Sequence, residues 1–118
     1  MNPIAERVEE AAPANTTKPA HLTRAKRTAI LKALADPRRF ELLEKIAKAN
    51  CPLGCAQARA GLPISAATLS HHIKELETAG LIEVRREGKF HFLSLRAGVL
   101  DALAANLAAL GQPSYPDR

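Results

Sequence analysis

Two cysteines, Cys51 and Cys55, lie close together in this chain of 118 residues, and the sequence contains no others. Pro-Leu-Gly separates them, and a short loop of such residues can bring two sulfur atoms within bonding distance, so that oxidation joins them. Alternatively, the two thiolates bind a soft ion together, or each cysteine is a small buried apolar residue without chemistry. Structural zinc fits worst, because it takes four ligands and no histidine lies near the pair in the sequence.

A second group of chemically useful side chains falls between residues 65 and 79, where the pattern predicts a helix. At about 3.6 residues per turn, Leu69, Ile73 and Leu76 share one apolar face. The opposite face carries small, hydroxyl, imidazole and ammonium groups, which can approach the base edges and phosphates of a major groove. Taken alone, this pattern favours an ordinary amphipathic surface helix. The candidate DNA contacts on the helix are Ser65, Ala67, Thr68, Ser70, His71 and Lys74.

Cations follow this helix on a predicted β-hairpin. Two runs of strand-forming residues, 81–86 and 90–95, flank a Glu-Gly-Lys segment that is typical of a hairpin tip. Arg85, Arg86 and Lys89 therefore lie beside the tip, where cations suit contacts with phosphate or with the minor groove. The alternative is an exposed hairpin that its charges keep soluble. Together, the helix and the hairpin favour DNA binding over both simpler interpretations.

The histidines divide by their positions. His71 points outward from the predicted helix, whereas His72 lies at the edge of its apolar face and is expected to pack there with a hydrogen bond. His91 alternates with phenylalanines on a strand and is interpreted as an ordinary strand residue. No pair of carboxylates, glycine-rich phosphate loop or Ser/His/Asp arrangement supports catalysis, so we do not expect an enzyme.

Short-range signals predict the elements that position these groups. Asp36 followed by Pro37 is typical of a helix start, because the carboxylate caps the N-terminus and proline is favoured at the first helical position. Apolar spacing predicts one helix before this point, over residues 22–35, and another after it, to about residue 49. The second of these helices is expected to bury Phe40, Leu43 and Ile46.

The remaining elements complete a recognisable order. A short helix is predicted over residues 54–60, and the helix over 65–79 is capped by Ser65 and ended by Gly80. After the hairpin, an alanine-rich helix carries a leucine stripe from residue 99 to residue 110. The order α-α-α-α-β-β-α predicts a mainly α fold with a small β-hairpin, which is a winged helix-turn-helix.

Length and charge agree with one small DNA-binding domain. A domain is expected over residues 21–110, between proline-containing tails at 1–20 and 111–118. Hydrophobic residues make up 47% of the chain, and its net charge of +5 suggests a polyanionic partner. No apolar run reaches the roughly 20 residues of a membrane span, and the start has no signal-peptide core. We therefore expect a cytoplasmic protein without membrane partners, whose two thiols normally stay reduced.

Three linked segments resemble the ArsR-type (arsenic-repressor) family of winged helix-turn-helix regulators. They are LKALADPRR at 31–39, the T-x-S-H-H-I-K-x-L core at 68–76 and AGLIEVRREGK at 79–89. The resemblance implies a homodimer built largely from the first and last helices, which binds double-stranded operator DNA with inverted-repeat symmetry and represses transcription. Two such subunits would reach half-sites about one helical turn apart. The residues expected at the dimer interface are Ile30, Leu34, Leu100, Leu103, Leu107 and Leu110.

Members of this family usually release DNA when a metal ion, a metalloid or an oxidant binds. The Cys-x-Cys site that is common in their third helix would fall near residues 54–56, where this sequence has only Cys55, so Cys51 and Cys55 together are the remaining candidate for the inducer site. Arsenite or another trivalent metalloid would bind both thiolates with a third ligand from elsewhere, or oxidation would join them. The family's histidine- and carboxylate-rich site in the last helix has no counterpart, because only Asp101 could ligate there. Two alternatives stay open: a winged-helix regulator without metal or thiol sensing, and a module that binds proteins instead of DNA.

Overall fold

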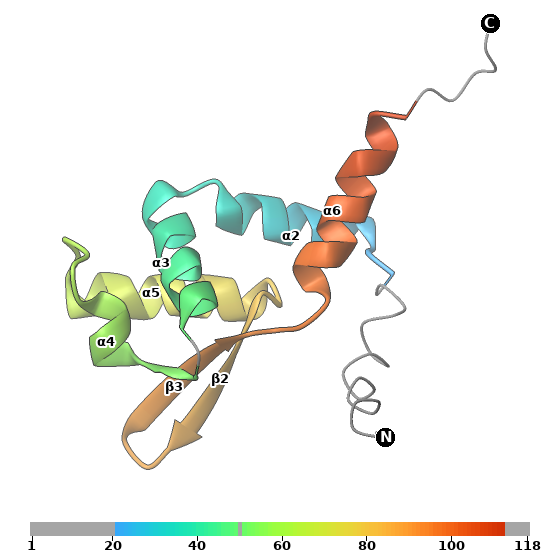
Figure 1. Cartoon of the computed structure of the whole chain (residues 1–118). Helices are drawn as coiled ribbons and strands as arrows, with labels where there is room; N and C mark the ends of the chain where they lie inside the picture. Colours follow the sequence, from blue (N-terminus) through green and yellow to red (C-terminus); the bar gives the residue numbers. More distant parts are fainter. Residues whose placement is uncertain (1–20, 50, 113–118) are drawn as a thin grey trace, which may run out of the picture. The chain divides into compact units, whose positions relative to one another are not determined.

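The computed structural model describes residues 21–49 and 51–112. Its elements are α2 (Arg24–Leu34), α3 (Pro37–Lys48), β1 (Leu53–Gly54), α4 (Cys55–Arg59), α5 (Ala66–Thr78), β2 (Ile82–Glu87), β3 (Phe90–Leu95) and α6 (Val99–Leu110) (Figure 1). The elements from α2 to β3 form one compact unit, and α6 belongs to a second. The mainly helical fold with a small antiparallel hairpin confirms the predicted winged helix-turn-helix.

The predicted tails fall largely outside this description, since residues 1–20 and 113–118 are not among the described ones. Within residues 21–49 and 51–112, no helix combines the length and the apolar character needed to cross a membrane.

Local capping explains where two of the helices begin. Asp36 precedes α3, and its Oδ1 accepts hydrogen bonds from the backbone N–H groups of Arg38 and Arg39 at 2.9 and 3.1 Å. These hydrogen bonds, the one from Arg39 foremost, lower the pKa of the Asp36 carboxyl. Ser65 caps α5 in the same way, with Oγ accepting from the N–H of Thr68 at 3.1 Å. Both predicted caps are confirmed.

The hydrophobic core of the unit from α2 to β3 lies where the helices meet the sheet. Leu81 links α5 to the wing within this core, because its N–H donates to the Leu76 carbonyl and its carbonyl accepts from the Arg96 N–H, each at 3.0 Å. The largest fully buried side chains are Ile30, Leu42, Leu76, Leu81, Ile82 and Leu93.

One expectation for the core is wrong. Phe40 was expected to be buried in α3 but is 44% exposed. The buried residues of this helix are Leu42, Leu43 and Ile46. Two residues correspond to about 200° around a helix, so a face centred on Leu42 turns Phe40 toward solvent.

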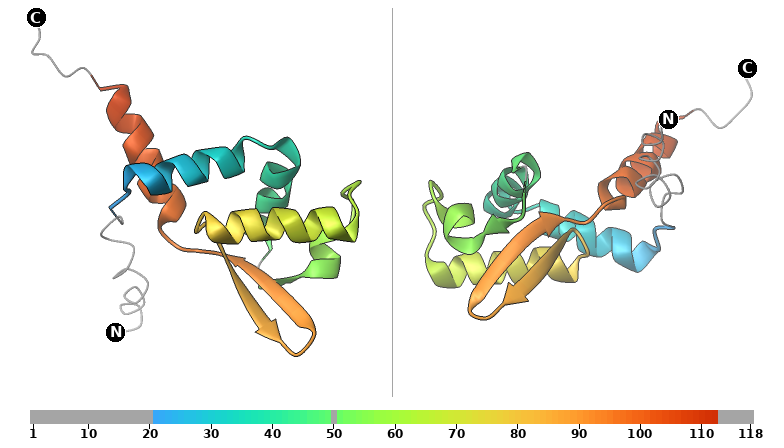
Figure 2. Two further views of the ribbon diagram at one scale, coloured as in Figure 1. Left: turned by 180° about the vertical axis from the view of Figure 1, so that it is seen from behind. Right: turned by 60° about the horizontal axis from the view of Figure 1, so that its bottom comes forward.

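The sheet contains a strand that the sequence did not predict. Its order is β1-β3-β2 with antiparallel neighbours, so the wing strand β3 is central and β1 is an edge. β1 pairs Leu53 with Leu93 and Gly54 with Phe92. The β2–β3 hairpin projects beyond the helices, with its tip away from α5 (Figure 2).

Helix α6, described by itself, starts after Gly98 and buries Ala102 and Leu103. Leu100, Leu107 and Leu110 are 37%, 46% and 79% exposed. Of the residues expected at a dimer interface, Ile30 and Leu103 are thus already buried in a single chain, whereas these three leucines are available to a partner. The homodimer stays a prediction.

Candidate DNA interface and thiol pair

The solvent-facing side of α5 carries the side chains expected to meet DNA. Its buried residues are Leu69, His72, Ile73 and Leu76, so the opposite face is open. At the start of the helix the Ser65 hydroxyl donates to Thr68 Oγ1 at 3.1 Å, which ties these two side chains to the cap. The predicted contacts Ser65, Ala67, Thr68, Ser70, His71 and Lys74 are all exposed.

Alternation along β2 sends its two neighbouring arginines to opposite faces. Cross-strand partners share a face, and Arg86 pairs with His91 whereas Arg85 pairs with Phe92. The Arg85 guanidinium lies 5.6 Å from the centroid of the Phe92 ring. Its Nε is also 2.8 Å from Glu87 Oε2. The structure therefore separates two predicted DNA contacts that are adjacent in the sequence.

A hollow of about 310 Å³ lies between α5 and the wing face that carries Arg86. Across it, Arg86 Nη2 is 3.3 Å from Glu77 Oε1 on α5. Predicted DNA contacts from α5 and from the wing therefore border this hollow. Cys55, one of the two predicted inducer thiols, borders it too. The residues that line it are Cys55, Ser70, Ile73, Lys74, Glu77, Thr78, Arg86 and His91.

Lys89 lies away from this hollow. Its Nζ is 5.8 Å from the centroid of the Phe90 ring, which is itself 60% exposed near the hairpin tip. Lys89 lines a second cavity of about 380 Å³ between the start of α4 and β3, and Cys55 borders this cavity too. Cys55 thus lies between two cavities that both face the wing.

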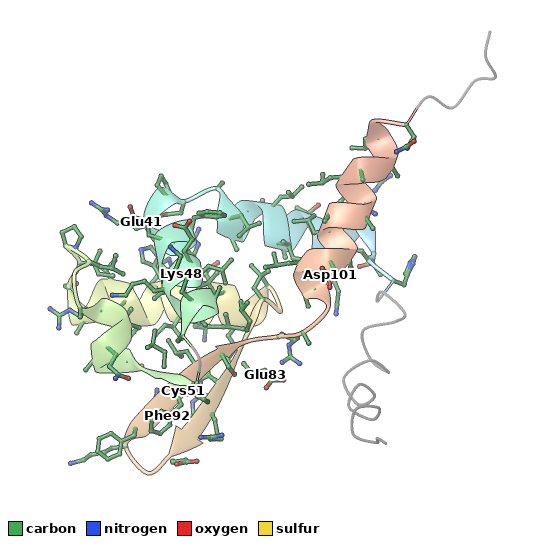
Figure 3. All side chains as sticks on the ribbon, in the orientation of Figure 1. Glu41, Lys48, Cys51, Glu83, Phe92 and Asp101 are labelled. Carbon is green, nitrogen blue, oxygen red and sulfur yellow. The ribbon has the colours of Figure 1, made fainter. Side chains whose placement is uncertain are left out.

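The two cysteines are free thiols in different surroundings. Cys51 is exposed just before β1, beside the wing (Figure 3), and Cys55 is half-buried as the first residue of α4. Burial raises the pKa of the Cys55 thiol, which keeps more of it in the protonated form. Within the described part of the chain, no three His, Cys, Asp or Glu side chains gather closely enough to hold a metal ion.

The segment between the cysteines is not the loop that was expected. Leu53 and Gly54 form β1 and are held extended by β3, and an extended residue advances the chain by about 3.3 Å. Two of the three residues between Cys51 and Cys55 are therefore held by β3, and their backbone pairing with it competes with a turn.

His72 is the one buried polar side chain among the described residues, and it joins three helices. Its Nδ1 is 3.4 Å from Arg39 Nη1, and Arg39 Nε donates to the Ala33 carbonyl at 2.8 Å. This confirms that His72 is a hydrogen-bonded packing residue. Desolvation lowers its pKa against the raising effect of the Asp36 carboxylate, and the positive charges of Arg39 and His71 lower it further.

The lowered pKa of His72 gives a pH dependence of folding. The unfolded chain binds a proton at His72 near pH 6.5, about its ordinary pKa, whereas the folded chain does so only at lower pH. We expect the contribution of neutral His72 to the free energy of unfolding to be complete above about pH 6.5. The free energy of unfolding should then fall as the pH drops from there toward the pKa of His72 in the folded state. Urea unfolding of wild type and His72→Gln between pH 5 and 7.5 checks this, with a flatter profile expected for the variant.

Exposed His91 supplies the control for this experiment, since it lies on the wing strand β3 and is not among the charged groups that shift the pKa of His72. His91→Gln is expected to keep the wild-type pH profile. A His72→Gln profile as steep as that of wild type would contradict the assignment.

Several residues of the site carry no strong sequence signal. Glu77 follows Lys74 by one helical turn, and Arg39 follows the cap Asp36 by three residues, but neither spacing predicts a partner on another element. His91 was interpreted as an ordinary strand residue, and the structure adds that it lines the hollow.

Comparison with known proteins gives a family and a fold. Residues 27–85 match a helix-turn-helix domain family. The chain is 35% identical over 79 residues to the arsenical resistance operon repressor of Staphylococcus aureus, covering 66% of this chain and 73% of that protein. The corresponding repressor of Staphylococcus xylosus is 37% identical over the same length, with the same shares covered.

Solved structures show the same arrangement. An ArsR-like transcriptional regulator from Rhodococcus sp. RHA1 superposes with a TM-score of 0.65 at 24% identity, over 74% of this chain and 80% of that one, which supports the fold alone. Reduced HlyU from Vibrio cholerae is 28% identical with a TM-score of 0.57, over 75% of this chain and 92% of that one.

Proposed function

The chain belongs to the ArsR-type winged helix-turn-helix transcriptional regulators, and from this we propose that it is an operator-binding homodimeric repressor which a thiol-directed signal at Cys51 and Cys55 releases from DNA. The signal is arsenite or another trivalent metalloid, or an oxidant. A DNA-binding repressor agrees with the helix-turn-helix family match and with the arsenical resistance repressors that the chain resembles.

The DNA-binding part of the proposal rests on α5 and the wing. The exposed face of α5 is small and polar, which suits the close approach to base edges in a major groove. Three cations are available for phosphate contacts: Arg86, Lys74 across the hollow from it, and Lys89 near the hairpin tip. Arg85 faces the other side of the wing, so DNA would have to wrap around the wing to reach it. Exposed leucines on α6 support pairing of two copies, which would address an inverted repeat.

The observation that carries the thiol part is the position of Cys55 in the hollow between α5 and the wing. The two elements expected to hold DNA must keep a fixed spacing, because base and phosphate contacts demand matching geometry. A bridge from Cys51 that displaces Cys55 would change this spacing directly. Release of DNA then needs no signal carried through the core.

Joining the two thiols has a structural consequence at β1. Arsenite would exchange hydroxyl groups for the two thiolates, whereas a hydroperoxide would oxidise the two thiols to a disulfide and be reduced to water and an alcohol. A disulfide needs the two cysteine Cα atoms within about 7 Å of each other, and the pairing of Leu53 and Gly54 with β3 restricts how far the segment between the cysteines can turn. We therefore expect bridging to detach β1 from β3 and so to loosen the wing strand.

A regulator without thiol sensing is the second candidate, and one observation favours it. The raised pKa of Cys55 leaves less thiolate for binding or oxidation at neutral pH. In that case Cys55 is a half-buried packing residue, Cys51 is an exposed thiol without a role, and the protein binds DNA whatever the thiol chemistry.

Fluorescence anisotropy on duplex DNA from upstream of the gene distinguishes these candidates. Reduced wild-type protein is expected to bind with a steep salt dependence and to lose at least roughly tenfold in affinity when arsenite or hydrogen peroxide is added. Cys51→Ser and Cys55→Ser are each expected to bind as reduced wild type does and to ignore the reagent, because one thiol cannot form the bridge.

Three results would redirect the proposal. A wild-type protein indifferent to both reagents favours the thiol-independent regulator. A full response in both serine variants moves the inducer site elsewhere. Absence of salt-dependent DNA binding favours a module that binds proteins.

A further inference from the structure

Glu77 occupies an unusual place for a carboxylate, on the hollow where DNA phosphates are expected. Among the described residues that line this hollow, it is the one acidic side chain, and Lys74 and Arg86 are the cationic ones. Its Oε1 lies 3.3 Å from Arg86 Nη2, and the two side chains are 35% and 54% exposed. The ion pair therefore ties the recognition helix α5 to the wing from the side that would face DNA.

Other ion pairs of the wing differ in what they connect. Arg85 pairs with Glu87 on its own strand, and Arg96 pairs with Glu83 across the hairpin at 3.3 Å. Neither of these two ion pairs connects the wing to α5. The Arg86–Glu77 pair, in contrast, has to be broken or shared if Arg86 is to turn to a DNA phosphate.

A guanidinium binds carboxylate and phosphate through the same pair of N–H donors. We propose that Glu77 is an internal competitor of the DNA phosphate: its carboxylate holds Arg86 in the free protein, and DNA must displace it to gain the Arg86 contact. This inference rests on the proposed DNA-binding function and adds to it a residue that lowers affinity. Glu77 thus sets how readily the wing engages DNA.

The competition has a characteristic dependence on salt. An exposed ion pair is weak and is screened as salt rises, so the competitor acts mainly at low ionic strength. Removing it is expected to raise affinity about three- to fivefold at low salt. The gain should shrink toward none at high salt, which makes the salt dependence of the variant steeper than that of wild type.

Glu77→Gln tests the proposal against a matched control, Glu75→Gln. Glu75 is exposed two residues earlier on α5, and its replacement changes the net charge equally. Both changes are made in wild type and in Arg86→Gln, and anisotropy is measured on a 30-base-pair duplex at several salt concentrations. Sequence-independent phosphate binding suffices for this readout, so the operator need not be known.

We expect Glu77→Gln to bind more tightly than Glu75→Gln at low salt, and this difference to vanish in the Arg86→Gln background. Equal gains for the two glutamine variants, or a Glu77→Gln advantage that persists without Arg86, would overturn the inference while leaving the DNA-binding function intact. Failure of every protein to bind the duplex would instead overturn the proposed function, and the inference with it.

Discussion

Ala67→Glu is expected to weaken binding to duplex DNA by at least roughly thirtyfold, because a carboxylate facing phosphates and base edges costs about 2 kcal/mol or more. Ala67 is exposed at the second position of α5, on the face that is predicted to enter the major groove. The fold should tolerate the change, since a negative charge in the first turn of a helix interacts favourably with its dipole. Anisotropy gives the affinity, and urea unfolding checks that stability shifts by no more than about 0.5 kcal/mol.

Ala25→Glu is the matched control for this prediction. Ala25 is also exposed at the second position of a helix, α2, so the helical environment and the charge change are the same. Its DNA affinity should fall far less than that of Ala67→Glu. Equal losses in the two variants would mean that the net charge of the domain, and not the α5 face, controls binding.

Leu76→Ala is expected to lower the free energy of unfolding by about 2–5 kcal/mol, the range for a buried leucine that leaves a cavity. Leu76 is fully buried on α5, and its carbonyl accepts the Leu81 N–H at 3.0 Å where the chain turns from α5 into the wing. Small domains have only about 5–15 kcal/mol of stability, so the loss is large. DNA binding should weaken as well, because α5 packs against α2, α3 and β2 and Leu76 is fully buried on it.

Leu31→Ala provides the comparison within the same unit. Leu31 is 43% exposed on α2, so truncating it removes less buried surface and is expected to cost less than about 1 kcal/mol. Both variants are compared by urea unfolding at one protein concentration. Similar losses for Leu31 and Leu76 would contradict the core described for this unit.

The arrangement of the thiols suggests how a chemical signal would reach DNA. β1 is short, lies at the edge of the sheet and is held by pairing with the wing strand β3. Cys51 precedes this strand and Cys55 follows it, at the border of both cavities that face the wing. A bridge between the two thiols would therefore act on the wing, which carries the predicted DNA contacts Arg86 and Lys89.

Local chemistry was enough to predict most elements of the fold from the sequence. The Asp36-Pro37 and Ser65 helix starts, and the end of α5 at Gly80 with φ of +83°, depend on one side chain and the backbone next to it. The exposed face of α5 follows equally from helical periodicity, because neighbours within one helix have fixed angular positions. For the same reason His72 could be assigned to the interior before its partner Arg39 was known.

Features that depend on contacts between distant segments were decided by the tertiary structure alone. β1 exists because β3 pairs with it, and two residues carry too little pattern to predict a strand. Alternation along β2 already places Arg85 and Arg86 on opposite faces, but the packing of the hairpin decides that the Arg86 face is the one that meets α5. The Arg86–Glu77 pair and the place of Cys55 beside it arise only when the wing folds back against α5. The sequence by itself therefore determined which residues are candidates for DNA contact or thiol chemistry, and the packing of the wing on α5 determined which of these candidates lie together.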